Sequence, residues 1–338
     1  MPKQTICLTP RVSGVGGMVS FSHKLAAGLE TRGVNVIYDL DAAYDAVLVI
    51  GGTRQLAGLW RAKRRGVPIV QRLDGMNWLH RKLPTGARHH LRATYGNLLL
   101  AFIRRMATHI VYQSNFVVEW WEREHSPTRV PYSVIYNGVD LEAYSPQGTH
   151  QHPSSIYRLL LVEGSLDGGY EMGLESAVGM ADILADEYHL PIELMVVGKV
   201  SAELKANWDA RSRVPINWVG LVPRADIPAI DRSAHLLYSS DLNAACPNSV
   251  IEALACGLPV VAYDTGALPE LVTPQAGRVV AYGGDPWQLD PPDVPALAAG
   301  AAAVLADQES FRAGARARAE ATFSLDKMVD AYLDILLG

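Results

Sequence analysis

The chain has 338 residues, of which 49% are apolar, and a formal net charge of −5 at pH 7. This length allows two domains with a core each, and this apolar content excludes a disordered chain. No apolar run approaches the ~20 residues that a membrane-spanning helix needs. The three cysteines are few, odd in number and set among apolar residues, which indicates reduced thiols in the cytoplasm and not a disulfide framework.

The charge is distributed unevenly along the chain. Residues 54–105 contain 12 Lys and Arg against one acid, Asp74, so this segment carries 12 − 1 = +11 and the remainder −16. Such a segment predicts an anionic partner, either a membrane surface or a charged acceptor, although a solvated basic face is the plain alternative. No motif indicates nucleic acid binding. His80, His89 and His90 have no Cys or carboxylate at ligand spacing, so no metal site is expected.

The N-terminal part alternates strands with helices. Residues 4–8 predict a buried strand, followed by the glycine-rich loop 13–17, a helix over about 18–32 and strands at 34–38 and 46–50. This order is typical of nucleotide-binding α/β folds, although the dinucleotide spacing G-x-G-x-x-G is absent. The glycines would let the backbone approach a ligand closely, or the loop could be a simple tight turn.

The next strand begins at 67–70 and ends in Q-R-L-D-G at 71–75. Open α/β sheets place their sites just past the carboxyl ends of strands, so Asp74 is a candidate site residue. An ordinary Asp-Gly turn is the alternative. A strand at 109–114 then leads into a capped helix over 115–124.

After a polar stretch at 146–155 with the composition of a linker, the alternation resumes. It predicts a parallel sheet with helices on both faces. The strands are expected at 157–162, 192–197, 216–220 and 235–239, and the helices at 171–184, 224–230, 295–306, 309–322 and 325–337.

The most informative stretch is P-N-S-V-I-E-A-L-A-C-G-L-P-V-V-A-Y at 247–263. It predicts a short helix that Asn248 or Ser249 caps and Gly257 ends, followed by a buried strand. The start of such a helix is a ready phosphate site, and Glu252, one turn in, could accept hydrogen bonds from the two hydroxyls of a ribose. Ser249 and Glu252 also match a capping box, in which the glutamate bonds back to the chain.

This stretch, together with Y-N-G-V-D-L-E-A-Y-S-P at 136–146, resembles the retaining GT-B glycosyltransferases of family four. The resemblance implies an α/β protein with two Rossmann-like domains whose parallel sheets face each other across a cleft. The expected division is an acceptor-side domain at 1–145, a linker at 146–155, a nucleotide-sugar donor domain at 156–322 and a last helix at 323–338 that returns to the first domain.

The resemblance also assigns roles. The donor would be a UDP- or GDP-linked sugar, with no cofactor and no metal, and the acceptor an unidentified glycan, lipid or metabolite, anionic or presented on a membrane. The protein would be cytoplasmic, with peripheral contact at the inner face of the membrane through 54–105. Glu252 would hold the ribose and Asp74 would lie near the transferred sugar. The other donor-side residues would be Gly16, Gly17, Asn248, Ser249 and Val250, and the acceptor-side residues Arg72, Asn77 and Asn137.

Two departures from the family pattern bear on activity. The first acid of its Glu-x7-Glu motif is Ala244 here, and the loop E-G-S-L-D-G-G-Y-E at 163–171 lacks the Arg and Lys that reach the donor phosphates. Lys199 and Arg224, near the ends of neighbouring strands, are the candidates to replace that charge. A binding or scaffold protein with an impaired donor site is therefore an alternative. A GT-B epimerase is another, although its acid and base residues have no match.

Overall fold

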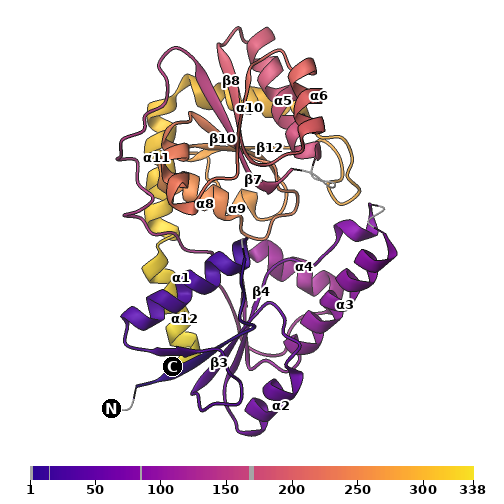
Figure 1. The fold of residues 1–338 in the computed structure, drawn as a ribbon, viewed down its shortest axis with the longest axis vertical. Coiled ribbons are helices and arrows are strands. Elements are labelled where there is room, and N and C mark those ends of the chain that lie inside the picture. Colours follow the sequence, from indigo (N-terminus) through magenta and orange to yellow (C-terminus); the bar gives the residue numbers. More distant parts are fainter. Residues whose placement is uncertain (1–2, 15, 84–85, 167–170) are drawn as a thin grey trace. The chain divides into compact units, whose positions relative to one another are not determined.

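The computed structural model describes residues 3–14, 16–83, 86–166 and 171–338, which form two compact units (Figure 1). The first unit contains Met1–Gly138 and Leu325–Gly338, and the second contains Val139–Ser324. Within the described residues each unit is built on a six-stranded, all-parallel sheet with flanking helices. The predicted fold class, two Rossmann-like α/β domains, is confirmed.

The sheet of the first unit has the strand order β2-β1-β3-β4-β5-β6. The central strand β3 is a continuous apolar run, A-V-L-V-I, because helices cover both faces of the sheet there. The strands are β1 (Thr5–Thr9), β2 (Asn35–Ile37), β3 (Ala46–Ile50), β4 (Ile69–Leu73), β5 (His109–Tyr112) and β6 (Tyr132–Val134).

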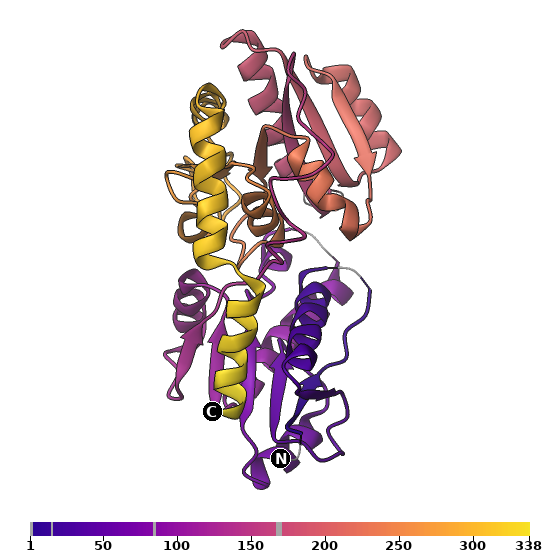
Figure 2. The same ribbon diagram turned by 90° about the vertical axis from the view of Figure 1, so that its left-hand side faces the viewer.

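Alternation along β1 separates the two faces of this sheet. Ile6 and Leu8 pack with α1 (Gly17–Thr31) and α12 (Leu325–Leu337), while Cys7 points to the other face. Figure 2 shows α12 in front of the sheet, beside α1. The opposite face is covered by α2 (Leu56–Arg64) and α3 (Ala87–Arg104), and α4 (Asn115–His125) follows β5.

The sheet of the second unit has the order β12-β11-β10-β7-β8-β9. One cluster of its core joins side chains of the strands with those of the helices α5, α10 and α11, and the buried side chains of α8 lie outside that cluster. The strands are β7 (Tyr157–Ser165), β8 (Ile192–Lys199), β9 (Ile216–Gly220), β10 (Leu236–Ser239), β11 (Val260–Tyr263) and β12 (Gly277–Val280). The helices are α5 (Glu171–Asp186), α6 (Ala202–Arg211), η2 (Arg224–Asp226), α7 (Ile227–Arg232), α8 (Asn248–Ala255), α9 (Leu268–Leu271), α10 (Val294–Ala306) and α11 (Gln308–Thr322).

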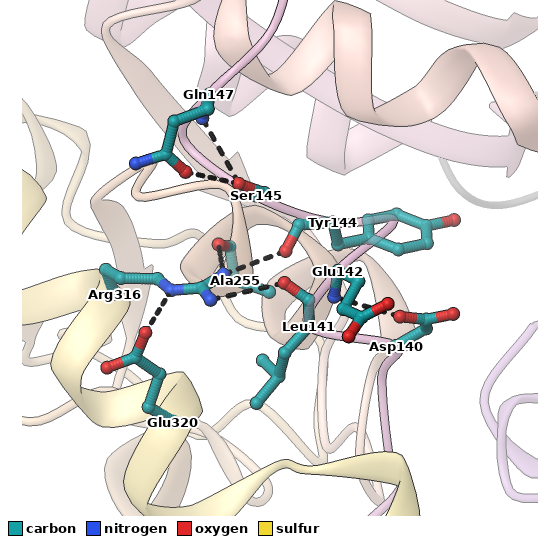
Figure 3. Close-up of polar contacts among 9 residues, drawn as sticks. All are labelled: Asp140, Leu141, Glu142, Tyr144, Ser145, Gln147, Ala255, Arg316 and Glu320. Carbon is teal, nitrogen blue, oxygen red and sulfur yellow. Dashed lines mark hydrogen bonds and ion pairs between the residues drawn. The ribbon is translucent and has the colours of Figure 1, made fainter.

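The chain passes from the first unit to the second at Gly138–Val139, earlier than the expected boundary at 145. The N–H of Val139 donates to the Phe323 carbonyl at 2.8 Å, so the segment begins paired to the second unit. Arg316 on α11 then binds the carbonyls of Leu141 and Tyr144 (Figure 3). These contacts make 139–145 part of the second unit.

The last helix, α12, belongs to the first unit. The ring of Tyr332 lies 5.3 Å from that of Phe21 on α1, measured between centroids. Arg32, which caps the end of α1, is paired to Asp330 at 2.5 Å and to Asp326 at 3.0 Å. The N–H of Gly138 also faces the Met328 sulfur at 3.1 Å. The C-terminal residues therefore complete the core of the first unit.

Candidate functional site

The helix α8 begins at Asn248, and its N-cap residue is Pro247. The prediction that Asn248 or Ser249 caps the helix is wrong. The N-cap position falls on Pro247, one residue before Asn248, and no side chain makes a capping hydrogen bond. The capping box of Ser249 with Glu252 is not formed for the same reason. An α-helix leaves the N–H groups of its first turn without intrahelical partners, so this helix start suits an anion.

The structure brings together two of the residues predicted for the donor site, Glu252 on α8 and Arg224 at the start of η2. Nη2 of Arg224 lies 3.2 Å from Oε1 of Glu252. The glutamate side chain is 10% exposed and the arginine side chain 43%. The carboxylate is thus held close to α8, while much of the guanidinium remains open to a ligand.

Tyr144 lies near this pair and is a residue that sequence reasoning missed. Its side chain is buried, and burial together with the negative charge of Glu252 raises the pKa of the phenol to about 12. Figure 3 shows the ring directed away from Arg316, which binds the backbone of the same residue. The family-like string at 136–146 contains Tyr144, but only the fold shows that this string runs beside α8.

Acidic side chains occupy the carboxyl ends of β7 and β10. Oε1 of Glu163 accepts a hydrogen bond from the Ser240 hydroxyl at 2.8 Å. Burial, and then the neighbouring Asp241, raise the pKa of Glu163 well above its ordinary value, because two close carboxylates cannot both ionise freely. Burial likewise raises the pKa of Asp241. The loop that lacks the expected basic pair begins here, and its residues 167–170 lie outside the described residues.

Lys199 ends β8 next to this acidic group. It is exposed, its position pairs with Ser165 on β7, and its carbonyl accepts from the Leu166 N–H at 3.0 Å. The backbone is therefore fixed while the side chain is left to solvent. Lys199 is placed at the carboxyl edge of the sheet, where the sequence predicts a phosphate contact.

Asn243, in the loop between β10 and α8, is a second residue that the sequence did not single out. Its backbone is left-handed, with φ of 54°, and its side chain is buried with Nδ2 unbonded to any described group. Gly266 packs closely against this loop, since a Cβ at residue 266 would lie only 2.4 Å from the backbone nitrogen of Ala244. The amide donor stands beside Ala244, where the family has an acid. The sequence offers one signal for this position: the residue is an Asn, which tolerates a left-handed backbone better than most residues do.

In the first unit, Arg72 and Asn137, two of the residues predicted for the acceptor side, lie in contact with each other. Nη2 of the buried Arg72 donates to Oδ1 of Asn137 at 2.7 Å, and its guanidinium lies 3.8 Å from the centre of the Phe21 ring. Asn77 is exposed, and its hydrogen bond is to a different residue. Its backbone N–H donates to Oδ1 of Asn97 on α3 at 3.0 Å.

Asp74 follows β4 and is half-buried. Burial raises the pKa of its carboxyl, and the positive charge of Arg72 opposes that rise. The backbone around it is tightly fixed, because the Trp121 indole donates to the Asp74 carbonyl at 2.8 Å and a Cβ on Gly75 would lie 2.4 Å from Trp120. A carboxyl so placed can hold a proton or orient a hydroxyl.

The glycine-rich loop leads directly into α1. Gly16 is the N-cap, with φ of 128°, and α1 begins at Gly17 without a side-chain cap. Both glycines are exposed, and Val15 of this loop lies outside the described residues. Like α8, this helix thus presents N–H groups of its first turn without a competing side chain.

The described residues contain neither a cluster of metal ligands nor a membrane-spanning helix. No group of three or more His, Cys, Asp or Glu side chains there has the arrangement of a metal site. No helix in those ranges is both long and apolar enough to cross a membrane.

Comparisons with known proteins agree with this geometry. A family model described as glycosyl transferases group 1 matches residues 158–307. The lipopolysaccharide core biosynthesis mannosyltransferase LpcC of Rhizobium leguminosarum bv. viciae is 28% identical over 315 residues, which cover 84% of this chain and 83% of that protein.

Solved structures share the fold across the whole chain. Sucrose-phosphate synthase from Thermosynechococcus elongatus superposes with a TM-score of 0.71 at 16% identity, covering 98% of each chain. Anabaena HepE in complex with UDP and glucose gives 0.67 at 16% identity, covering 98% of this chain and 99% of that one. WaaG, involved in lipopolysaccharide biosynthesis, gives 0.68 at 15% identity, covering 99% and 100%. The chain therefore has the fold of the GT-B glycosyltransferases, and its residues 158–307 match the family model of glycosyl transferases group 1.

Proposed function

We propose that the protein transfers a sugar, with retention of its anomeric configuration, from a nucleotide-sugar donor to an acceptor in the synthesis of a lipopolysaccharide-type glycan. The observation that carries this proposal is the uncapped start of α8 with the Glu252–Arg224 pair beside it. The names of LpcC and WaaG support the class of product, and the UDP and glucose in the HepE complex support the class of donor.

Each half of the donor has a partner on α8 or next to it. The N–H groups of Asn248, Ser249 and Val250 would bind the diphosphate, whose negative charge grows as the sugar leaves, so the site would favour the transition state. Glu252 would accept hydrogen bonds from the ribose hydroxyls. The Asn243 amide would donate to a sugar hydroxyl, replacing a contact that Ala244 lacks the atoms to make.

Arg224 would supply part of the positive charge that the 163–171 loop lacks. Its guanidinium has five N–H donors, and the contact with Glu252 uses one of its nitrogens. A diphosphate could therefore bind the remaining donors without breaking the ion pair. Lys199 would add a second positive charge at the carboxyl edge of the sheet, opposing the acids of Glu163 and Asp241.

The chemistry would need no protein nucleophile. In same-face transfer the departing phosphate accepts the proton of the attacking acceptor hydroxyl while the bond from the anomeric carbon to the leaving oxygen breaks. Asp74 would orient the reacting sugar or the acceptor. Gly16 and Gly17 would let the backbone at the start of α1 approach the donor. No metal is needed in this scheme, because the helix start and the cations neutralise the leaving group.

The test has two stages. Calorimetric titration with UDP, GDP, ADP and dTDP, each also as its common sugar conjugates, should show saturable binding of one nucleotide. Proton NMR of the product, made with that donor and a lipid A–core oligosaccharide fraction, should then show the donor's own anomeric configuration. An inverted product contradicts the retaining mechanism.

Arg224→Gln tests the phosphate role. It should weaken the preference for nucleoside diphosphate over monophosphate about ten-fold or more, since a charge-assisted bond is worth about 1.5–3 kcal/mol. The matched control is Arg211→Gln, because Arg211 is an exposed arginine of the same unit that stacks on Trp208. Equal losses in both variants would remove Arg224 from the site.

The second candidate is a binding or scaffold protein with an impaired donor site. Ala244 and the acids Glu163 and Asp241, where cations are expected, favour it. It predicts no saturable binding of any of the four nucleotides at millimolar concentration, so the first titration separates the two candidates.

A further inference from the structure

The helix α3 carries an exposed apolar stripe on the outside of the first unit. Four large apolar side chains there are about half exposed or more: Leu91 at 70%, Tyr95 at 53%, Leu98 at 63% and Phe102 at 49%. Their spacing of four, three and four residues places them on one face of a helix. At about 1.5 Å per residue the stripe runs for about 16 Å. Single exposed apolar residues are ordinary, but a contiguous row marks an interaction surface.

The stripe is not a misplaced core face, because the opposite face of α3 is fixed against the sheet. Ala93, Asn97 and Ile103 on that face are buried. Nδ2 of Asn97 donates to the Asn77 carbonyl at 2.8 Å, and Nε2 of Gln71 donates to the Leu100 carbonyl at 3.2 Å. These bonds set the rotation of the helix. The apolar residues of the outer face are therefore held toward solvent.

Positive charge borders the stripe. Arg88 and Arg92 are exposed and follow the same helix edge, next to Leu91 and Tyr95. Of the 12 basic residues at 54–105, Arg72 and Arg104 are buried, so 12 − 2 = 10 lie at the surface, against the single acid of that segment. Figure 1 shows α2, which carries three of these ten, on the same side of the sheet as α3.

The neighbouring helix repeats the same chemistry. Trp60 on α2 is 54% exposed, and the guanidinium of Arg64 lies 4.6 Å from the centre of its ring. Tryptophan and arginine side chains of this kind are typical of the interface between lipid head groups and acyl chains. Helices with an apolar face and flanking cations lie in that interface plane.

We infer that the outer face of α3, the stripe Leu91–Tyr95–Leu98–Phe102 with Arg88 and Arg92, docks on an anionic lipid bilayer. The leucines and aromatic rings enter the acyl boundary, and the arginines bind lipid phosphates. The sequence predicts a membrane contact for the whole of 54–105, and this inference assigns that contact to one face of α3. The surface belongs to the first unit and the donor site to the second, so separate assays distinguish a failure of this inference from a failure of the proposed transferase activity.

The test is co-sedimentation of the full chain with vesicles. Vesicles of equal parts phosphatidylglycerol and phosphatidylcholine should bind the protein at low salt, and pure phosphatidylcholine vesicles should bind it far more weakly. Leu91→Gln/Leu98→Gln should lower the partition coefficient about ten-fold per leucine. A loss of this size corresponds to a large share of the free energy gained by burying one leucine side chain. Arg88→Gln/Arg92→Gln should lower it about five-fold per arginine and flatten the salt dependence.

The matched control is Leu221→Gln. Leu221 is 69% exposed, almost the same as Leu91, but lies in the second unit between β9 and η2. The Leu221→Gln variant should bind vesicles as the unaltered protein does. All of these positions are at the surface, and circular dichroism checks that each variant is folded.

Several results overturn the inference. They are an absence of binding to anionic vesicles at low salt, equal binding to both lipid compositions, and an equal loss in Leu221→Gln. Sedimentation velocity tests whether a second copy covers the stripe instead. Concentration-dependent dimerisation that Leu91→Gln/Leu98→Gln abolishes would assign the stripe to self-association and overturn the membrane assignment.

Discussion

Arg316 on α11 binds backbone carbonyls of two other segments of the second unit, residues 139–145 and the end of α8 (Figure 3). Nη1 donates to the carbonyl of Tyr144 at 2.9 Å and to that of Ala255, the last residue of α8, at 2.7 Å. Nη2 donates to the Leu141 carbonyl at 3.2 Å. Nε is paired with Glu320, one turn further along α11, at 2.6 Å. Replacing Arg316 with Met keeps the apolar stem and removes every donor.

The expected loss follows from these contacts. A hydrogen bond to a charged donor contributes about 1.5–3 kcal/mol, and an acceptor left without a partner pays its desolvation. The Arg316 side chain is 22% exposed, so water can partly replace it and the low end applies. The three carbonyl bonds together then amount to about 4 kcal/mol. For a unit of this size that corresponds to a fall in melting temperature of about 8–16 °C.

Differential scanning calorimetry and urea titration measure this loss. The two units can unfold in separate transitions, and the loss belongs to the transition of the second unit. Arg316→Lys should fall between Arg316→Met and the unaltered protein, because an ammonium is a point charge and cannot reach three carbonyls as the planar fork does. The matched control, Glu320→Gln, removes only the partly exposed ion pair and should cost less than about 1 kcal/mol.

A loss in Arg316→Met no greater than that in Glu320→Gln would refute this reasoning. It would mean that water replaces the guanidinium without cost and that other contacts hold the segment 139–145 on the second unit.

Two further predictions concern pH. Burial, with His152 and the nearby arginines, lowers the pKa of His235 to about 3, while Nδ1 accepts a hydrogen bond from the Arg158 N–H at 3.0 Å. The unfolded chain takes up the proton near pH 6.5, so this stability is present above that pH and lost as pH falls toward 3. Between pH 6.5 and 5 the protein should lose about 2 kcal/mol relative to His235→Asn, which keeps an acceptor, in urea titrations at both pH values. Equal pH dependence in the two proteins would contradict the shift. Burial, and then Glu252, raise the pKa of Asp231 well above its ordinary value, so its contribution is lost as pH rises above the unfolded value of about 3.9. Asp231→Asn, which keeps an acceptor for the Cys256 thiol, should therefore melt higher at pH 7, with the gain vanishing near pH 4; no gain at pH 7 would contradict it.

The parts of the fold that the sequence predicts are those with strong local patterns. The apolar runs of β1, β3 and β7 and the Gly257 stop after α8 are local features, and the structure has them where the pattern puts them. The sequence singled out both Arg224 and Glu252 for the donor site, and the structure brings these two residues into contact.

The parts that were missed depend on distant residues. The helix α3 escapes periodicity because its apolar residues lie on two faces, one buried and one exposed, so no single stripe emerges. The boundary at Gly138–Val139 depends on Arg316, far along the chain. Asn243 owes its burial to the Gly266 loop packed against it. The cap predicted for α8 failed because Pro247 occupies the N-cap position, so that Asn248 and Ser249 already lie in the first turn of the helix.

The central claim is that α8 binds a nucleotide-sugar donor with Glu252 on its ribose. The most direct measurement is calorimetric titration of the preferred nucleoside diphosphate and of its 2′,3′-dideoxy analogue, with the unaltered protein, with Glu252→Ala and with the exposed control Glu309→Ala. The unaltered protein and the control should prefer the ribose form by about ten-fold or more, since a bond to a carboxylate is worth about 1.5–3 kcal/mol. Glu252→Ala should bind both forms equally and weakly. Undiminished binding of the ribose form by Glu252→Ala would contradict the claim.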